Sequence, residues 1–370
     1  MANILDLIVK MIEWKASDLH LTVGAAPMLR VDGELRPFDN HPLTPDETQS
    51  LAYSVMKEEQ KKKFEDFDLD KERGRQVDFS FGIRHQTADG HPFDARFRAN
   101  VFMQRGMVSL VLRHIPTEIK DFDALGAPKI LAEFCDRPRG LVLVTGPTGS
   151  GKSTTLAAMV DKINRERSEH ILTIEDPIEF VHKHKKCIVN QREVYSDTTS
   201  FAQALKVALR QDPDVVLLGE IRDKITAEIA LQIAETGHLT FATLHTNSAA
   251  QTINRLIDMF EQGERDAVRG QLGFVLEGVC CQQLIPKIGG GRALAAEVLN
   301  VTPAIRSLIR DDKIHQIQGI MEVSQKYGMQ TLNMDLAKLV ISRKISKEEA
   351  FTYSTEHEQL EKFISGNFRM

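Results

Sequence analysis

The sequence lacks the features of disulfide-rich, zinc-binding and membrane-spanning proteins. Its four cysteines contain no C-x-x-C pair, so we predict neither a disulfide framework nor a zinc site, and a reduced cytosolic protein fits better. No run reaches the length of about 18 apolar residues that a membrane-crossing helix needs. The apolar N-terminal stretch is interrupted by Asp6, Lys10 and Glu13, which is not typical of a signal peptide. We therefore expect a soluble cytoplasmic protein that reaches a membrane only through partners.

Aromatic residues and positive charge are also scarce. The chain has one tryptophan, four tyrosines and a formal net charge of −5. Proteins that move along nucleic acid need a basic channel and aromatic side chains that stack on bases. The local basic run His182–Lys186 is interpreted as a surface loop, or else as a contact with a neighbour or membrane-side partner. We therefore expect no nucleic-acid partner.

What the sequence does contain is a phosphate-binding loop. Four apolar residues, Leu141–Val144, predict a buried parallel strand, and Gly146–Ser153 then matches G-x-x-x-x-G-K-[ST]. In such loops backbone N–H groups surround phosphate oxygens, Lys152 reaches the β- and γ-phosphates, and the Ser153 hydroxyl ligates Mg²⁺. The following helix directs its positive end at the phosphates. The predicted nucleotide-binding residues are Gly146, Pro147, Thr148, Gly149, Ser150, Gly151, Lys152, Ser153 and Thr154.

The order of predicted elements indicates an α/β protein of several parts. Residues 1–116 combine helical spacing with alternating strands, as in an α+β domain, and residues 117–139 are predicted to be a linker around one short helix. From 140 to 262, short apolar strands alternate with helices, which predicts a mostly parallel sheet covered by helices. Residues 263–370 are predicted to be helical to the end. Ligands bind at the carboxyl ends of such strands, so the side chains that follow them are candidates.

Carboxylates follow two of these strands. The strand at 170–174 is followed by Glu175, Asp176 and Glu179. Beside a triphosphate, one carboxylate would ligate Mg²⁺ and another would orient or deprotonate the attacking water, whereas the alternative is a solvated acidic turn. The strand at 215–218 is followed by Gly219 and Glu220, which leaves Glu220 as the only carboxylate there and a candidate metal ligand.

Histidines and arginines complete the candidate set. His245 follows the strand at 240–244, and we expect His238 to lie on the same side of the sheet. The two histidines would either hydrogen-bond the γ-phosphate and sense its hydrolysis, or be structural residues. Alternation over 93–102 places Arg96 and Arg98 on one face of a strand, and Arg113 ends the next strand. Planar guanidinium groups are well suited to binding a phosphate. More often, however, arginines in a row on a strand simply form the solvated face of a sheet. An arginine that completes a nucleotide-hydrolysing site contributes about 10³–10⁵ in rate.

Together these residues resemble the secretion ATPase family, and its pilus-retraction members in particular. The resemblance runs over nearly the whole chain. Its motifs are an N-terminal signature at Ala16–Leu21, a Walker A loop at Gly146–Thr154, an Asp box at Ile171–Phe180, a Walker B segment at Val215–Asp223, a His box at Glu235–His238 and Thr243–Thr246, and a C-terminal motif, AIRNLIRE, at Ala304–Arg310. Ser307 stands where that last motif has Asn, and Asp311 stands where it has Glu.

The resemblance implies a homohexameric ring whose subunits have a PAS-like N-terminal domain, a RecA-like P-loop NTPase core and a helical C-terminal region. It implies that Glu179 is the catalytic glutamate and that Glu220 works with Mg²⁺. It also implies that His238 and His245 sense the nucleotide, and that the three arginines reach it. Sequential ATP hydrolysis would extract pilin subunits from the pilus. The implied partners are an inner-membrane platform protein (PilC-like) at the pilus base and a paralogue of the PilU type.

Other interpretations stay open. An accessory retraction ATPase of the PilU type would share these motifs. Pilus-assembly and type II secretion ATPases have a longer N-terminal region and usually a four-cysteine zinc motif, neither of which this sequence contains. From other classes, a RecA-like nucleic-acid motor would show DNA-stimulated ATP hydrolysis that is lost at modest salt. A non-hydrolysing nucleotide switch would bind ATP tightly without turnover.

Overall fold

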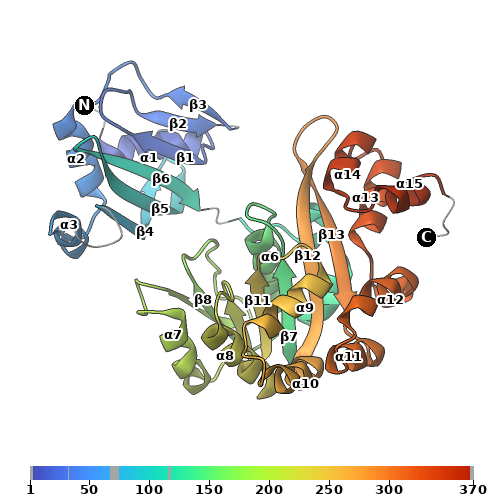
Figure 1. Cartoon of the computed structure of the whole chain (residues 1–370). Helices are drawn as coiled ribbons and strands as arrows, with labels where there is room; N and C mark the ends of the chain where they lie inside the picture. Colours follow the sequence, from blue (N-terminus) through green and yellow to red (C-terminus); the bar gives the residue numbers. More distant parts are fainter. Residues whose placement is uncertain (1–2, 32, 67–74, 116–117, 367–370) are drawn as a thin grey trace. The chain divides into compact units, whose positions relative to one another are not determined.

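The computed structural model describes residues 3–31, 33–66, 75–115 and 118–366. The chain forms two compact units, residues 1–117 and residues 118–370, which we describe separately (Figure 1). The predicted boundaries at 116, 139 and 262 are finer than this division and stay predictions. Among the described residues, every helix is too short or too polar to span a bilayer.

Unit 1 is a six-stranded antiparallel sheet with helices packed into one core. The strand order is β3-β2-β1-β6-β5-β4. The strands are β1 (Asp18–Leu21), β2 (Met28–Val31), β3 (Glu34–Pro37), β4 (Gln76–Gln86), β5 (Pro92–Gln104) and β6 (Met107–Ile115). The helices are α1 (Ile4–Glu13), α2 (Pro45–Ser54) and α3 (Glu58–Glu65). Ala95, Phe97 and Ala99 of β5 are buried in this core, as their alternation with polar residues predicts. The predicted α+β character of this part is confirmed.

Unit 2 is built on a seven-stranded sheet with the order β13-β12-β7-β11-β10-β8-β9. Its strands are β7 (Gly140–Thr145), β8 (His170–Glu175), β9 (Ile188–Glu193), β10 (Val215–Leu218), β11 (Leu239–Leu244), β12 (Leu276–Pro286) and β13 (Arg292–Asn300). The pairings are parallel except that of β12 with β13. The predicted parallel α/β core is therefore confirmed.

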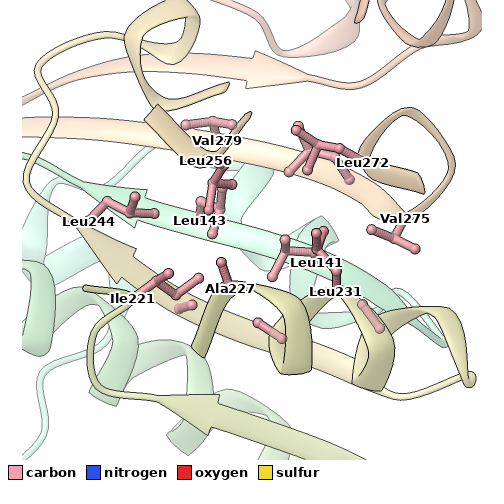
Figure 2. Close-up of a cluster of buried hydrophobic side chains, with 14 of the residues drawn as sticks. Leu141, Leu143, Ile221, Ala227, Leu231, Leu244, Leu256, Leu272, Val275 and Val279 are labelled. Carbon is pink, nitrogen blue, oxygen red and sulfur yellow. The ribbon is translucent and has the colours of Figure 1, made fainter. Parts of the chain in front are cut away.

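Helices cover both faces of this sheet. Leu141 and Leu143 of β7 face one hydrophobic core, which contains residues of α8, α9 and α10 and is drawn in Figure 2. Val142 and Val144, which alternate with them, face a second core that includes α5 and α6. The helices before residue 276 are α4 (Phe122–Leu125), α5 (Ile130–Cys135), α6 (Lys152–Glu166), α7 (Phe201–Ala208), α8 (Lys224–Glu235), α9 (Ala249–Asp258) and α10 (Arg265–Val275). Because β7 is buried on both faces, its residues are apolar without alternation, which explains the continuous apolar run Leu141–Val144.

The expectation that residues 263–370 are entirely helical is wrong. β12 and β13 form an antiparallel hairpin, coloured orange in Figure 1, and β12 pairs in parallel with the central strand β7. Helices resume only afterwards, as α11 (Pro303–Arg310), α12 (Ile317–Val323), α13 (Leu332–Ile341), α14 (Lys347–Tyr353) and α15 (His357–Ile364). β12 is largely buried and shows no clean period-two alternation, so its sequence does not distinguish a strand from a buried helix.

Candidate functional site

The loop between β7 and α6 has the backbone that a phosphate-binding loop requires. Gly149 and Gly151 have φ values of +80° and +88°, in the left-handed region that favours glycine. A Cβ atom at Gly146 would lie 2.2 Å from the carbonyl oxygen of Gln282, so this position has no room for a side chain. α6 begins at Lys152, directly after the loop. The positive end of this helix therefore adjoins the loop, where an anion is favoured.

β12 fixes the loop from the side. The buried Gln282 side chain donates a hydrogen bond from Nε2 to the carbonyl oxygen of Ser150 at 2.8 Å. At the base of the loop, the Thr145 hydroxyl contacts the Sγ atom of Cys281 at 2.9 Å. The sequence interpretation missed both contacts because it placed no strand here. The only available signal was the short apolar run around Cys280.

Lys152 lies at the centre of the charged groups. Its Nζ atom donates to the carbonyl oxygens of Gly146 (2.8 Å) and Pro147 (3.0 Å). Burial lowers the pKa of Lys152, and the charges of Glu220 and Glu179 partly offset this effect. Both predicted acidic groups are therefore close enough to act on Lys152, although they follow different strands.

These residues fit a magnesium nucleotide. The described residues contain no cluster of three or more His, Cys, Asp or Glu side chains that would hold a metal ion unaided. Mg²⁺ is usually bound by one or two carboxylates together with substrate phosphates and water, so no such cluster is required. Ser153 and Thr154 lie in the first turn of α6, and Glu220 follows β10. Ser153 and Glu220 are thus suitable ligands for Mg²⁺ bound to a triphosphate.

Glu220 is held by two neighbouring side chains. Its carboxylate accepts a hydrogen bond from Nε of Arg222 at 2.8 Å and lies 3.3 Å from Nε2 of His245. Because β10 and β11 are parallel neighbours, their carboxyl ends place Glu220 and His245 side by side. Arg222 also lies 3.9 Å from Asp176 of the Asp box. The sequence interpretation looked for an arginine elsewhere and missed Arg222, which its position two residues after Glu220 could have indicated.

The three carboxylates at the end of β8 and in the loop that follows have different surroundings. Glu175 accepts hydrogen bonds from the Thr173 hydroxyl (2.6 Å) and from Nε2 of Gln191 (3.2 Å). Burial of its carboxyl group raises the pKa of Glu175 to about 7. Asp176 and Glu179, in contrast, are exposed. Glu175 therefore serves to anchor the loop, and Asp176 and Glu179 are the carboxylates available to a ligand.

Residues of β9 fasten the same loop. Gln191 donates from Nε2 to the carbonyl oxygen of Phe180 and accepts from the backbone N–H of His182, both at 2.8 Å. The carboxylate of Glu193 accepts from the backbone N–H of Ile178 at 3.2 Å. The segment that presents Glu179 is thus held at both ends by a strand that the sequence interpretation did not identify.

His238 lies at the other edge of the sheet, contrary to expectation. It precedes β11, whereas His245 follows it, so about 20 Å of strand separates the two histidines. The Nδ1 atom of His238 lies 3.0 Å from the carbonyl oxygen of Ile233 and 3.1 Å from the Thr236 hydroxyl, at the end of α8. Closeness in sequence misled here because a strand of six residues lies between the two positions. Within one chain, His238 therefore lies away from His245 and from the carboxyl ends of the strands.

The three candidate arginines share a face of the unit 1 sheet. Arg96 and Arg98 lie two residues apart on β5, and Arg98 is paired with Arg113 of β6. Arg113 donates from Nε to Asp18 at 2.8 Å. Burial alone would raise the pKa of Asp18, but hydrogen bonds from Arg113 and Ser17 and the Arg113 charge hold it below its ordinary value.

Comparisons with known proteins agree with this geometry. Residues 93–290 match the model of the family described as "Type II/IV secretion system protein". The chain is 50% identical to the type IV pilus retraction ATPase PilT of Pseudomonas aeruginosa, over 90% of this chain and 93% of the relative. It is 39% identical to the type IV pilus ATPase PilU of the same organism, over 96% and 89% of the two chains.

A solved structure is also similar over the whole chain. A crystal structure of the pilus retraction motor PilT with bound ADP superimposes with a TM-score of 0.89 at 51% identity. The match covers 98% of this chain and all of that one. The resemblance inferred from the sequence motifs is thereby confirmed. The chain belongs to the type II/IV secretion ATPase family and is a homologue of its PilT-type members.

Proposed function

We propose that this chain, an ATPase of the secretion family, hydrolyses ATP with Mg²⁺ and uses the energy to retract a type IV pilus. The observation that carries the proposal is the phosphate-binding loop itself, with its left-handed glycines, its lack of room for a side chain at Gly146 and Lys152 bonded across it. The identity to PilT, which exceeds that to PilU, favours a retraction motor over an accessory one.

The roles of the residues follow from their positions. Lys152 and the loop N–H groups from Gly146 to Ser153 bind the phosphates and neutralise charge that develops on them. Mg²⁺, held by Ser153 and Glu220, would supply further charge neutralisation. Glu179, exposed on a loop fastened by Gln191, orients the attacking water and accepts its proton. His245, beside Glu220, senses the γ-phosphate.

The remaining roles rest on the family resemblance. The working form would be a homohexamer in the cytoplasm at the inner-membrane base of the pilus machine, and the partners would be a PilC-like platform protein and a PilU-like paralogue. Arg96, Arg98 and Arg113 would contact the nucleotide. His238 would take part in sensing only through a neighbouring subunit, because within its own chain it lies at the opposite edge of the sheet from His245.

Deletion of the gene in its host, with complementation by wild type or Lys152→Ala, tests the proposal. Loss of twitching together with excess surface pili is the expected result, and Lys152→Ala should fail to complement. Missing pili would instead identify an assembly motor. Normal pilus retraction with a defect only under load would favour the PilU-type role. DNA-stimulated turnover of the purified protein would support a nucleic-acid motor.

A further inference from the structure

A cavity with charged walls lies in unit 2, away from the phosphate-binding loop. It has a volume of about 360 Å³ and is lined by the carbonyl ends of α8 and α10, the start of β7, and α11. Gly140 of β7 and Glu277 of β12 line it, while these two strands meet the phosphate-binding loop at their other ends. The six residues of β7 place about 20 Å between the two sites. Binding in this cavity would therefore not compete with the nucleotide.

Positive charge dominates the cavity wall. The wall contains three arginines, Arg139, Arg306 and Arg310, and one carboxylate, Glu277. Nη2 of Arg306 lies 2.6 Å from Glu277, and the Nε atom of Arg137 lies 3.6 Å from the same carboxylate. The one acidic group of the cavity is thus already neutralised from inside the protein.

The motif at Ala304–Arg310 supplies two of these arginines with different tasks. Arg306 donates from Nη1 to the carbonyl oxygens of Gly273 (2.9 Å) and Phe274 (2.6 Å), where it caps the end of α10. A Cβ atom at Gly273 would lie 3.2 Å from the backbone oxygen of Arg306, so the glycine permits α10 and α11 to pack closely. The guanidinium group of Arg306 is therefore engaged in hydrogen bonds within the protein, and Arg306 has a structural role.

Arg310 and Arg139 are free to bind a ligand. Both are exposed, and neither forms an ion pair with any residue in the described ranges. Within the part of the chain that the structure describes, the hydrogen bond that Arg310 donates goes to the Ser307 hydroxyl, at 3.2 Å. The phenyl ring of Phe274, on the same wall, belongs to a residue that is 59% exposed. Arginine and exposed aromatic residues around a concave site are the composition of binding hot spots.

We propose that this cavity is a docking site for an acidic protein segment of a partner. Carboxylates of the segment would pair with the planar guanidinium groups of Arg139 and Arg310, which suit bidentate contacts, and an apolar side chain would cover Phe274. The inference goes beyond the proposed function and does not depend on it, because nothing in the cavity contacts the nucleotide loop.

Fluorescence anisotropy of the full-length protein tests the proposal with a labelled octapeptide of Glu and Asp around one leucine. The peptide should bind, and a peptide with Lys at each acidic position should not. Arg310→Glu and Arg139→Glu should each weaken binding about tenfold or more, and Arg310→Gln should have a smaller effect. Arg292→Glu is the matched control, because Arg292 is exposed, lacks an ion pair among the described residues and begins β13, where it pairs with Pro286 at the far end of β12. It should leave binding within about twofold.

Several results would overturn the proposal. These are no binding by wild type at millimolar peptide, equal binding of the lysine peptide, or unchanged binding by Arg310→Glu in a protein whose thermal unfolding is normal. Displacement of the peptide by millimolar inorganic phosphate would identify a general anion site instead. Altered sedimentation of Arg310→Glu without peptide would identify a second copy of the chain as the occupant. Lys152→Ala should bind the peptide normally, so failure of the ATPase proposal would not affect this result.

Discussion

The Nε2 atom of Gln282 lies 2.8 Å from the carbonyl oxygen of Ser150, so a strand residue 132 positions further along the chain fixes the tip of the phosphate-binding loop. The carbonyl oxygen of Gln282 closes the other side of the loop, where only a glycine fits at position 146. The loop conformation therefore depends on β12 as much as on its own glycines.

Gln282→Ala should weaken nucleotide binding. The substitution leaves a buried carbonyl group without its donor, which costs about 1–3 kcal/mol, and the loop loses its fixed shape. We expect the Kd for ATP to rise about tenfold, as measured with a fluorescent nucleotide. Gln283→Ala is the control, since Gln283 lies on the same strand with its side chain on the opposite face. Equal effects of both variants would contradict a specific role for Gln282.

Glu179→Gln should separate binding from hydrolysis. The amide keeps the size of the side chain but cannot accept a proton, and general-base catalysis contributes about 10²–10⁴ in rate. We expect an unchanged Kd for ATP and a turnover reduced by at least about a hundredfold, in single-turnover assays. If Glu179→Gln hydrolyses ATP normally, Glu220 becomes the candidate base, and Glu220→Gln is the next variant to measure.

Glu175→Gln should change how stability depends on pH. Burial raises the pKa of Glu175 from 4.5 in the unfolded chain to about 7 in the folded protein. Between these two pH values the folded protein keeps a proton that the unfolded chain has lost. The stability contributed by the protonated carboxyl is fully present below pH 4.5 and is lost as pH rises through about 7, a difference of up to about 3 kcal/mol.

The glutamine side chain of the Glu175→Gln variant cannot titrate. The plot of unfolding free energy against pH should therefore be flatter for this variant, as measured by denaturant unfolding between pH 5 and about 8. Glu179→Gln removes an exposed carboxylate from the same loop and serves as the comparison. A Glu175→Gln curve that keeps the wild-type slope would show that another group is responsible.

Arg113→Ala should destabilise unit 1 through Asp18. The buried carboxylate loses its closest cation, which costs about 1–3 kcal/mol, and the double variant Asp18→Asn/Arg113→Ala should recover part of the loss. Arg84→Ala removes an exposed ion pair, 2.9 Å long, and should cost less than about 1 kcal/mol.

Turnover separates this structural effect from a role at the nucleotide. If Arg113 contacts ATP, the stabilised double variant stays slow. Full turnover in the double variant would show that Arg113 only supports Asp18. Arg96→Ala and Arg98→Ala would then test the two arginines that remain on this face.

Local signals predicted the parts of the site that one segment encodes. The strand at Leu141–Val144, the glycines of the loop and the start of α6 all lie within one short stretch, whose chemistry is fixed by covalent neighbours. Glu220 and His245 were also foreseeable, because each lies within two residues of the end of a strand and adjacent parallel strands end on the same side of the sheet.

Contacts between distant segments could not be predicted in this way. Gln282 acts through a side-chain hydrogen bond to a loop 132 positions earlier, and Gln191 binds the loop that precedes its own strand; no residue pattern marks either contact. The prediction for His238 was wrong because this residue precedes β11 and His245 follows it, so the length of the strand separates two residues that are close in sequence. The environment of Glu175 likewise depends on β9, which shows no clear strand pattern before the fold is known.

The position of β12 gives the second unit a mechanical connection. Gln282 holds the phosphate-binding loop, and three residues later Ile285 is buried among side chains of α13, α14 and α15. β12 is paired with β13 along nine residue positions, so the two strands form a continuous ribbon. One β-strand therefore contacts both the phosphate-binding loop, through Gln282, and the C-terminal helices, through Ile285.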